Sequence, residues 1–113
     1  MRNPNQVVII VDVHNNSRDY VDSAFLAFCS DIEAKMEIIL VNDPMLMPLV
    51  MASGFKATAL VFNAKNAKDF YLATMAANFA GSCPLFARTT KAGSPVPDGF
   101  VEVTNAKEFF AQF

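Results

Sequence analysis

The sequence predicts a single α/β domain spanning residues 1–113, a three-layer α/β/α sandwich built on a five-stranded parallel sheet. Two observations predict it. The chain is 53% hydrophobic and 18% charged, and a chain of this length can bury about two-thirds of its unfolded surface in one core. Short β-branched runs alternate with segments of helical periodicity, and strands that alternate with helices pair in parallel through right-handed crossovers.

Residues 6–12, "QVVIIVD", predict the first strand, because the run is too short for a helix and is apolar on both faces, as in a central parallel strand. A helix should follow, with Ser17 as its N-cap. Its expected core positions recur at intervals of three and four residues: Val21, Ala24, Phe25, Phe28, Cys29 and Ile32.

Residues 36–42, "MEIILVN", predict the second strand. Asp43 can cap the helix that follows, and Pro44 can occupy its first turn, where a missing N–H costs no helical hydrogen bond. Gly54 is expected to end this helix.

The third and fourth strands are predicted over residues 57–63, "ATALVFN", and residues 84–89, "PLFART". Between them, Asn66 can cap a helix over "AKDFYLATMAANFA", which Gly81 should end.

A loop is expected where the alternation calls for a fourth crossover helix. Residues 90–99, "TKAGSPVPDG", hold two prolines and two glycines and cannot sustain a helix. Residues 100–103, "FVEV", then predict a fifth strand at the edge of the sheet, and residues 106–113, "AKEFFAQF", a final short helix.

The sulfur-containing side chains predict little chemistry. Cys29 and Cys83 lack CxxC spacing, so we expect two buried thiols, with a disulfide or a metal pair as the alternative. Met45, Met47 and Met51 fall at mixed helical spacings, and we expect them to fill the core rather than form a docking surface.

Charge and hydropathy exclude several classes of partner. Nine basic and eleven acidic residues give a net charge of −2 without a basic block, so direct binding of nucleic acid is not expected. No segment approaches the roughly 18 to 20 continuous apolar residues of a membrane span. We therefore predict a cytoplasmic protein with no membrane contact.

Polar residues follow the predicted strands at the edge where ligands bind in open parallel sheets. They are Asp12, His14, Asn15, Asn42, Asp43, Asn63, Thr89, Thr90, Thr104 and Asn105. The chain's only histidine, His14, is expected to be a solvated loop residue, with a ligand role as the alternative. Asp12 either forms an Asx turn or retains a cation-binding role.

Three of these strand ends resemble the receiver domains of two-component response regulators. "IVDVHN" is similar to the "IVDDHP" that opens many receivers, "ALVFN" falls where their strand ends in the phosphoacceptor aspartate, and "PLFART" resembles the "PVIxLT" strand that ends in their switch threonine. The resemblance covers most of the chain and implies the flavodoxin-like fold of receivers.

The receiver site implied by this resemblance is degenerate. Asp12 fits the first acidic position and Thr89 the hydroxyl position, but Val13 fills the second acidic position and Asn63 stands at the acceptor. The lysine that receivers place after the fifth strand has no counterpart, since Lys107 lies too far into the helix. A pseudo-receiver follows, with no catalysis, metal or cofactor, acting as a regulatory or interaction module in signalling or transcription control.

The resemblance also implies a surface for association, because receivers commonly pair through the side of the sheet that holds the fifth strand and last helix. Replacing a helix by the loop should uncover apolar surface there. The residues expected to form a homodimer contact, or a contact with another signalling protein, are Val101, Val103, Phe109, Phe110 and Phe113.

A second resemblance predicts a different class of function. Asp12 and Asn15 match the D-x-x-N opening of NYN/PIN-like ribonucleases, and "VNDPMLMPLV", with Asp43, resembles their "SGDxDFLPLV" segment. Such metal-dependent hydrolysis needs several converging carboxylates, of which this pattern offers two. An FMN site is a weaker alternative, because "VHNNSRD" lacks a glycine-rich phosphate loop.

Overall fold

The computed structural model describes residues 3–13, 23–53, 56–79, 81, 83–89, 93 and 96–113, and the side chains of these residues from Gln6 onward. In chain order the elements are β1 (Asn3–Asp12), α1 (Ser23–Glu33), β2 (Met36–Val41), the 3₁₀ helix η1 (Pro44–Leu46), α2 (Met47–Ala52), β3 (Ala59–Asn63), α3 (Ala67–Ala77), β4 (Leu85–Arg88), β5 (Phe100–Val103) and α4 (Ala106–Phe110).

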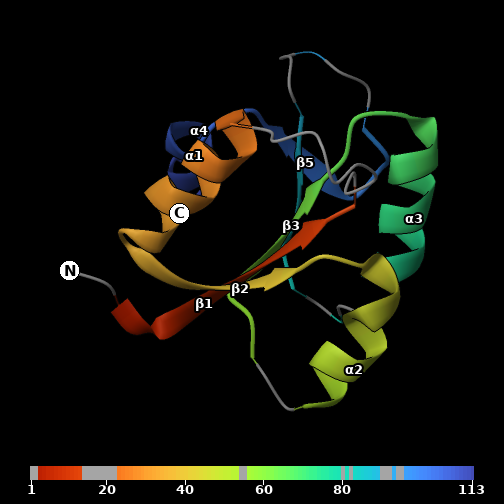
Figure 1. Ribbon diagram of the computed structural model, residues 1–113, viewed down its shortest axis with the longest axis horizontal. Helices are drawn as coiled ribbons and strands as arrows, with labels where there is room; N and C mark the ends of the chain where they lie inside the picture. The colour runs from red at the N-terminus through yellow and green to blue at the C-terminus, as the bar shows by residue number, and fades with distance from the viewer. Residues whose placement is uncertain are drawn as a thin grey trace.

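The five strands form one parallel sheet in the order β2-β1-β3-β4-β5 (Figure 1). This strand order is the flavodoxin-like one, and the order of the strands along the sheet reverses between β1 and β3. The parallel five-stranded prediction is therefore confirmed, and so is the edge position of β5.

Helices cover both faces of the sheet, with α1 and α4 on one side and α2 and α3 on the other (Figure 1). Alternate residues of β1 serve the two cores: Val8 and Ile10 pack with α1 and α4, whereas Ile9 and Val11 pack with α2 and α3. All four are fully buried, which explains why this strand is apolar on both faces.

Asx caps start three of the helical segments. Asp43, Asn66 and Asn105 each accept a hydrogen bond from a backbone N–H two or three residues on, with N···O distances of 2.9 Å. The caps at Asp43 and Asn66 confirm the sequence prediction. The segment after Asp43 begins as a 3₁₀ turn because Pro48 has no N–H for an α-helical bond to Pro44.

Several boundaries and positions differ from the prediction. Helix α3 ends at Ala77, before Gly81, whose φ of 66° lies in the left-handed region. Ala24 is exposed, so its assignment to the core is wrong; the buried stripe of α1 is Phe25, Phe28, Cys29 and Ile32. Ser17, Val21 and Gly54 lie outside the described residues.

The described part of the segment between β4 and β5 contains no helix, as the sequence predicts, and Gly99 there has a φ of 92°. None of the helices in the described residues is both long and apolar enough to cross a membrane.

Both cysteines are free thiols, with Cys29 buried and Cys83 half-buried. Met47 is fully buried and Met51 half-buried, but Met45 is 68% exposed. The prediction that the methionines fill the core is therefore wrong for Met45, which lies in the exposed 3₁₀ turn at the start of its helical segment.

Candidate functional site

The carboxyl ends of β1, β3 and β4 bring three polar side chains into one row. Asp12 pairs with Asn63 in the parallel register, and Asn63 pairs with Arg88. Because side chains alternate along a strand, Asp12 shares the face of Val8 and Ile10, on the side covered by α1 and α4. The register alone therefore joins residues that are far apart in the sequence.

Hydrogen bonds connect these side chains as carboxylate, amide and guanidinium. The Asn63 Nδ2 donates to Asp12 Oδ1 at 2.9 Å, and Arg88 Nη1 donates to Asn63 Oδ1 at 3.2 Å. Asn63 and Arg88 are only 2% and 3% exposed. The amide thus uses both of its functional ends to link an acidic and a basic side chain in the protein interior.

Two aromatic rings of α1 lie near the guanidinium. The Arg88 Cζ lies 5.9 Å from the centre of the Phe25 ring and 6.0 Å from that of Phe28, within the range of a cation–π interaction. A buried charge is stable only when it is paired or otherwise solvated by the protein. The rings and the Asn63 link to Asp12 together supply part of that stabilisation.

The same surroundings control the thiol of Cys29 on α1. Burial, as the largest cause, and the Asp12 carboxylate raise its pKa to about 11, against the opposing effect of the Arg88 guanidinium. Since thiolate is the reactive form, Cys29 is a protonated, unreactive thiol at neutral pH. The site therefore contains no activated sulfur nucleophile at this position.

A cavity of about 210 Å³ opens beside Arg88, between α1 and the start of α4. Its walls are Ala24, Ala27, Phe28, Asp31, Arg88, Thr104, Asn105 and Ala106. The cavity has an acidic side chain, Asp31, as well as the guanidinium, so its lining does not select for one sign of charge.

The other residues of the predicted receiver site have structural roles. The buried side chain of Val13 joins the core of the α2 and α3 side, away from the face of Asp12. Thr89 is buried, and its N–H donates to the Val103 carbonyl at 3.0 Å. His14, Asn15 and Thr90 lie outside the described residues.

Arg88 is the site residue that the sequence analysis missed. The signal available was a charged residue at the end of an otherwise apolar strand, "PLFAR", directly before the threonine matched to the receiver pattern. A charged side chain is almost never fully buried unless it is paired with another group.

Part of the predicted association surface lies in the hydrophobic core. Val103 and Phe109 are fully buried, so their assignment to a surface is corrected. The Phe109 ring lies edge-on to Phe86, 5.0 Å away between ring centres. Val101 and Phe113 are exposed, at 42% and 57%, and Phe110 is half-buried.

In the described structure, the acidic residues matched to the ribonuclease pattern do not form a cluster of metal ligands. Asp43 is exposed and caps η1 through its Oδ1, and Asp12 is bonded to Asn63. Over the described ranges, no group of three or more His, Cys, Asp or Glu side chains is placed to hold a metal ion.

Comparison of the chain with protein-family models, with curated proteins and with solved structures finds no significant match. The fold and the geometry at the carboxyl edge of the sheet are therefore what support a functional proposal.

Proposed function

We propose that the chain is a receiver-like module that works without phosphorylation or catalysis, regulating signalling or transcription through contacts with protein. The observation that carries the proposal is the hydrogen-bonded link from Asp12 through Asn63 to Arg88. Asn63 occupies the position of a receiver phosphoacceptor, and its amide is not a nucleophile for phosphoryl transfer. Arg88 supplies a cation next to Asn63 from within the chain itself, which supports a site that needs no external ion.

This arrangement supports a module whose site has a single conformation that does not depend on phosphorylation. The guanidinium hydrogen bond to Asn63 exists without a phosphoryl group, so the site needs no modification to become ordered. Output then depends on surface contacts with a second copy or with another signalling protein. We also propose a cytoplasmic location, which the two free thiols support.

Incubation with acetyl phosphate and Mg²⁺ is expected to leave the protein unphosphorylated, because Asn63 offers no carboxylate. Intact-mass spectrometry measures this directly. A hydroxylamine-labile gain of one phosphoryl group by the unmodified protein would overturn the proposal. Asn63→Asp is the matched variant: labelling of this variant alone would support Asn63 as the acceptor position.

Mg²⁺ and Mn²⁺ are expected to bind weakly or not at all, because the Asn63 amide oxygen already accepts from Arg88 and few charged oxygens remain to offset dehydration of the ion. Titration calorimetry provides the measurement. A micromolar dissociation constant that disappears in Asp12→Ala would contradict the pseudo-receiver proposal and favour the metal-dependent ribonuclease. Asp98→Ala, a change in the loop before β5, is the control for general loss of charge.

A further inference from the structure

We propose that a second copy of this chain binds at the groove between the η1–α2 segment and α3, forming a two-fold symmetric dimer. The proposal deepens the proposed function, because it names the partner and the surface through which a non-catalytic module would act. It differs from the association surface predicted on β5 and α4, which keeps only Val101, Phe110 and Phe113 outside the core.

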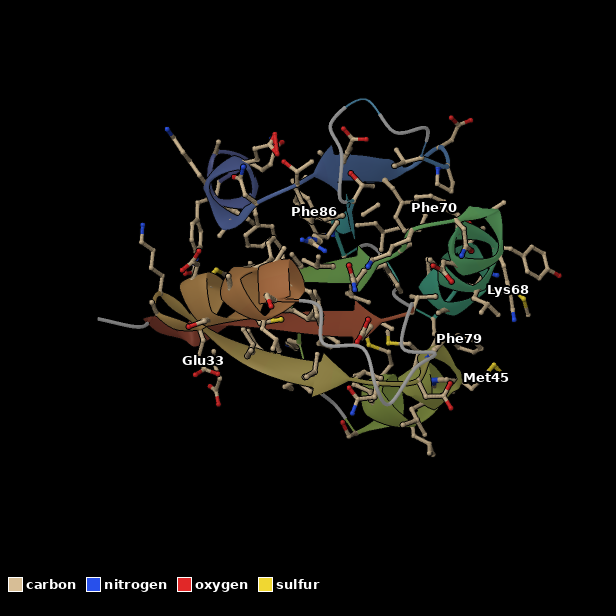
Figure 2. All side chains as sticks on the ribbon, turned by 45° about the horizontal axis from the view of Figure 1, so that its top comes forward. Glu33, Met45, Lys68, Phe70, Phe79 and Phe86 are labelled. Carbon is tan, nitrogen blue, oxygen red and sulfur yellow. The ribbon has the colours of Figure 1, made fainter. Side chains whose placement is uncertain are left out.

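The groove has a volume of about 170 Å³ and is lined by residues with apolar side chains. Its walls are Pro44, Met45, Pro48, Leu72, Met75, Ala76 and Phe79. Met45 and Phe79 lie close together where η1 meets the end of α3 (Figure 2). A site that offers so few polar groups favours an apolar occupant over a charged metabolite.

Helix α3 turns two small residues toward the sheet and leaves two large ones in solvent. It buries Ala73 and Ala76 and half-buries Leu72, whereas Tyr71 and Met75 are 66% and 44% exposed. Phe79, four residues beyond Met75, is 50% exposed. Helices of soluble domains normally bury their large apolar residues. The core of the single chain gives no reason for these large side chains, but a second molecule would.

The η1–α2 segment continues this apolar surface on the other side of the groove. Met45 is 68% exposed and Leu49, four positions later, is 70% exposed. We call the set Met45, Leu49, Tyr71, Met75 and Phe79 the α2–α3 patch. Within the described residues, half of the ten exposed large apolar side chains belong to it.

The area of the α2–α3 patch matches what a dimer requires. A large apolar side chain presents about 200 Å² when free, so the exposed fractions correspond to an area on the order of 600 Å². This area is at the upper end of the range for the largest apolar patch on a typical monomer, about 300–600 Å², and such a patch often has a function. A standard interface takes about 800 Å² from each partner, roughly two-thirds of it apolar in homodimers. The patch therefore supplies the apolar part of one partner's share.

Self-complementarity favours a second copy as the occupant. A two-fold interface needs a projection and a matching hollow on the same surface, since each molecule supplies both. Here Met45, a wall residue of the groove, is 68% exposed, and Leu49, which follows the wall residue Pro48 in the chain, is 70% exposed, so one surface carries both exposed apolar side chains and a hollow. No charged side chain lines the groove, so two copies meet there without like-charge repulsion at its centre.

Sedimentation velocity over a wide concentration range tests the proposal on the full chain. The unmodified protein is expected to dimerise, and Leu49→Asp and Met75→Asp are each expected to raise the dimer dissociation constant at least tenfold, because each buries a carboxylate in the interface. Phe113→Asp is the matched control on the α4 side and is expected to leave the constant unchanged. Far-UV circular dichroism confirms that every variant is folded.

Two results would overturn the proposal. One is a monomer at the highest concentration of unmodified protein. The other is a dimer that Phe113→Asp disrupts and both patch variants leave intact, which would place the contact on the surface predicted from the sequence. Neither result depends on the phosphorylation assay, so the proposed absence of catalysis is tested separately.

Discussion

Replacing Arg88 with methionine is expected to lower the free energy of unfolding by about 3 kcal/mol, because the buried amide oxygen of Asn63 loses its charged hydrogen-bond donor. Methionine keeps an unbranched apolar stem against Phe25 and Phe28, so lost packing contributes little. What disappears is the donor to the Asn63 amide oxygen. Urea denaturation followed by far-UV circular dichroism measures the change.

The double variant Asp12→Asn with Arg88→Met is the control. It removes both charges of the linked set, and neutral replacement of a whole network costs less than loss of one member. The double variant should therefore be more stable than Arg88→Met alone. If Arg88→Met lowered the free energy of unfolding by less than about 1 kcal/mol, the interactions of Arg88 would contribute no more than those of a solvent-exposed pair.

Phe109→Ala is expected to lower the free energy of unfolding by about 4 kcal/mol, the range found when a fully buried phenylalanine leaves a cavity. The Phe109 ring contacts Phe86 at 5.0 Å and Phe28 at 6.5 Å between ring centres, joining α4 to both β4 and α1. Removing it leaves a cavity where α4 meets that core, on which Ala106 and Phe110 still pack. The same denaturation experiment measures the loss.

Phe113→Ala is the matched control at the end of the same segment. Phe113 also lies against Phe109 but is 57% exposed, so its truncation should cost less than about 1.5 kcal/mol. If the two alanine variants were equally stable, Phe109 would not be part of the core, and its assignment to an association surface would return.

The strands were predictable because their signal is local. The runs that form β1 and β3 are apolar on both faces and end in a polar residue, which marks both the strand and its exit. The caps at Asp43 and Asn66 are local for the same reason, since each bonds within three residues. These two strands and these two helix starts therefore follow from short stretches of sequence, whereas β1 begins at Asn3, three residues before the predicted start.

The site depended on information that short stretches do not carry. Asp12 and Asn63 are 51 positions apart, and Asn63 and Arg88 are 25 apart. Only the order and register of the strands bring them together, and a single sequence specifies neither directly. Asp12 and Asn63 were singled out one at a time, but the link through Arg88 was not.

Helix α3 and the last helix show a second limit, which concerns the size of apolar residues. Alanine, tyrosine, methionine and phenylalanine all count as apolar, so periodicity alone does not show that α3 turns Ala73 and Ala76 inward and Tyr71 outward. The three phenylalanines at 109, 110 and 113 pose the same problem. Which ring is buried depends on its packing partners from other elements, and for Phe109 these are Phe28 of α1 and Phe86 of β4.

The central place of β1 has a consequence for how the protein is made. Strand β1 leaves the ribosome before both of its pairing partners, β2 and β3, and β3 is complete only at Asn63. Until then, a strand apolar on both faces has at least one unpaired edge, which is a template for aggregation. A nascent chain stalled before residue 63 is therefore the form of this protein most in need of a chaperone.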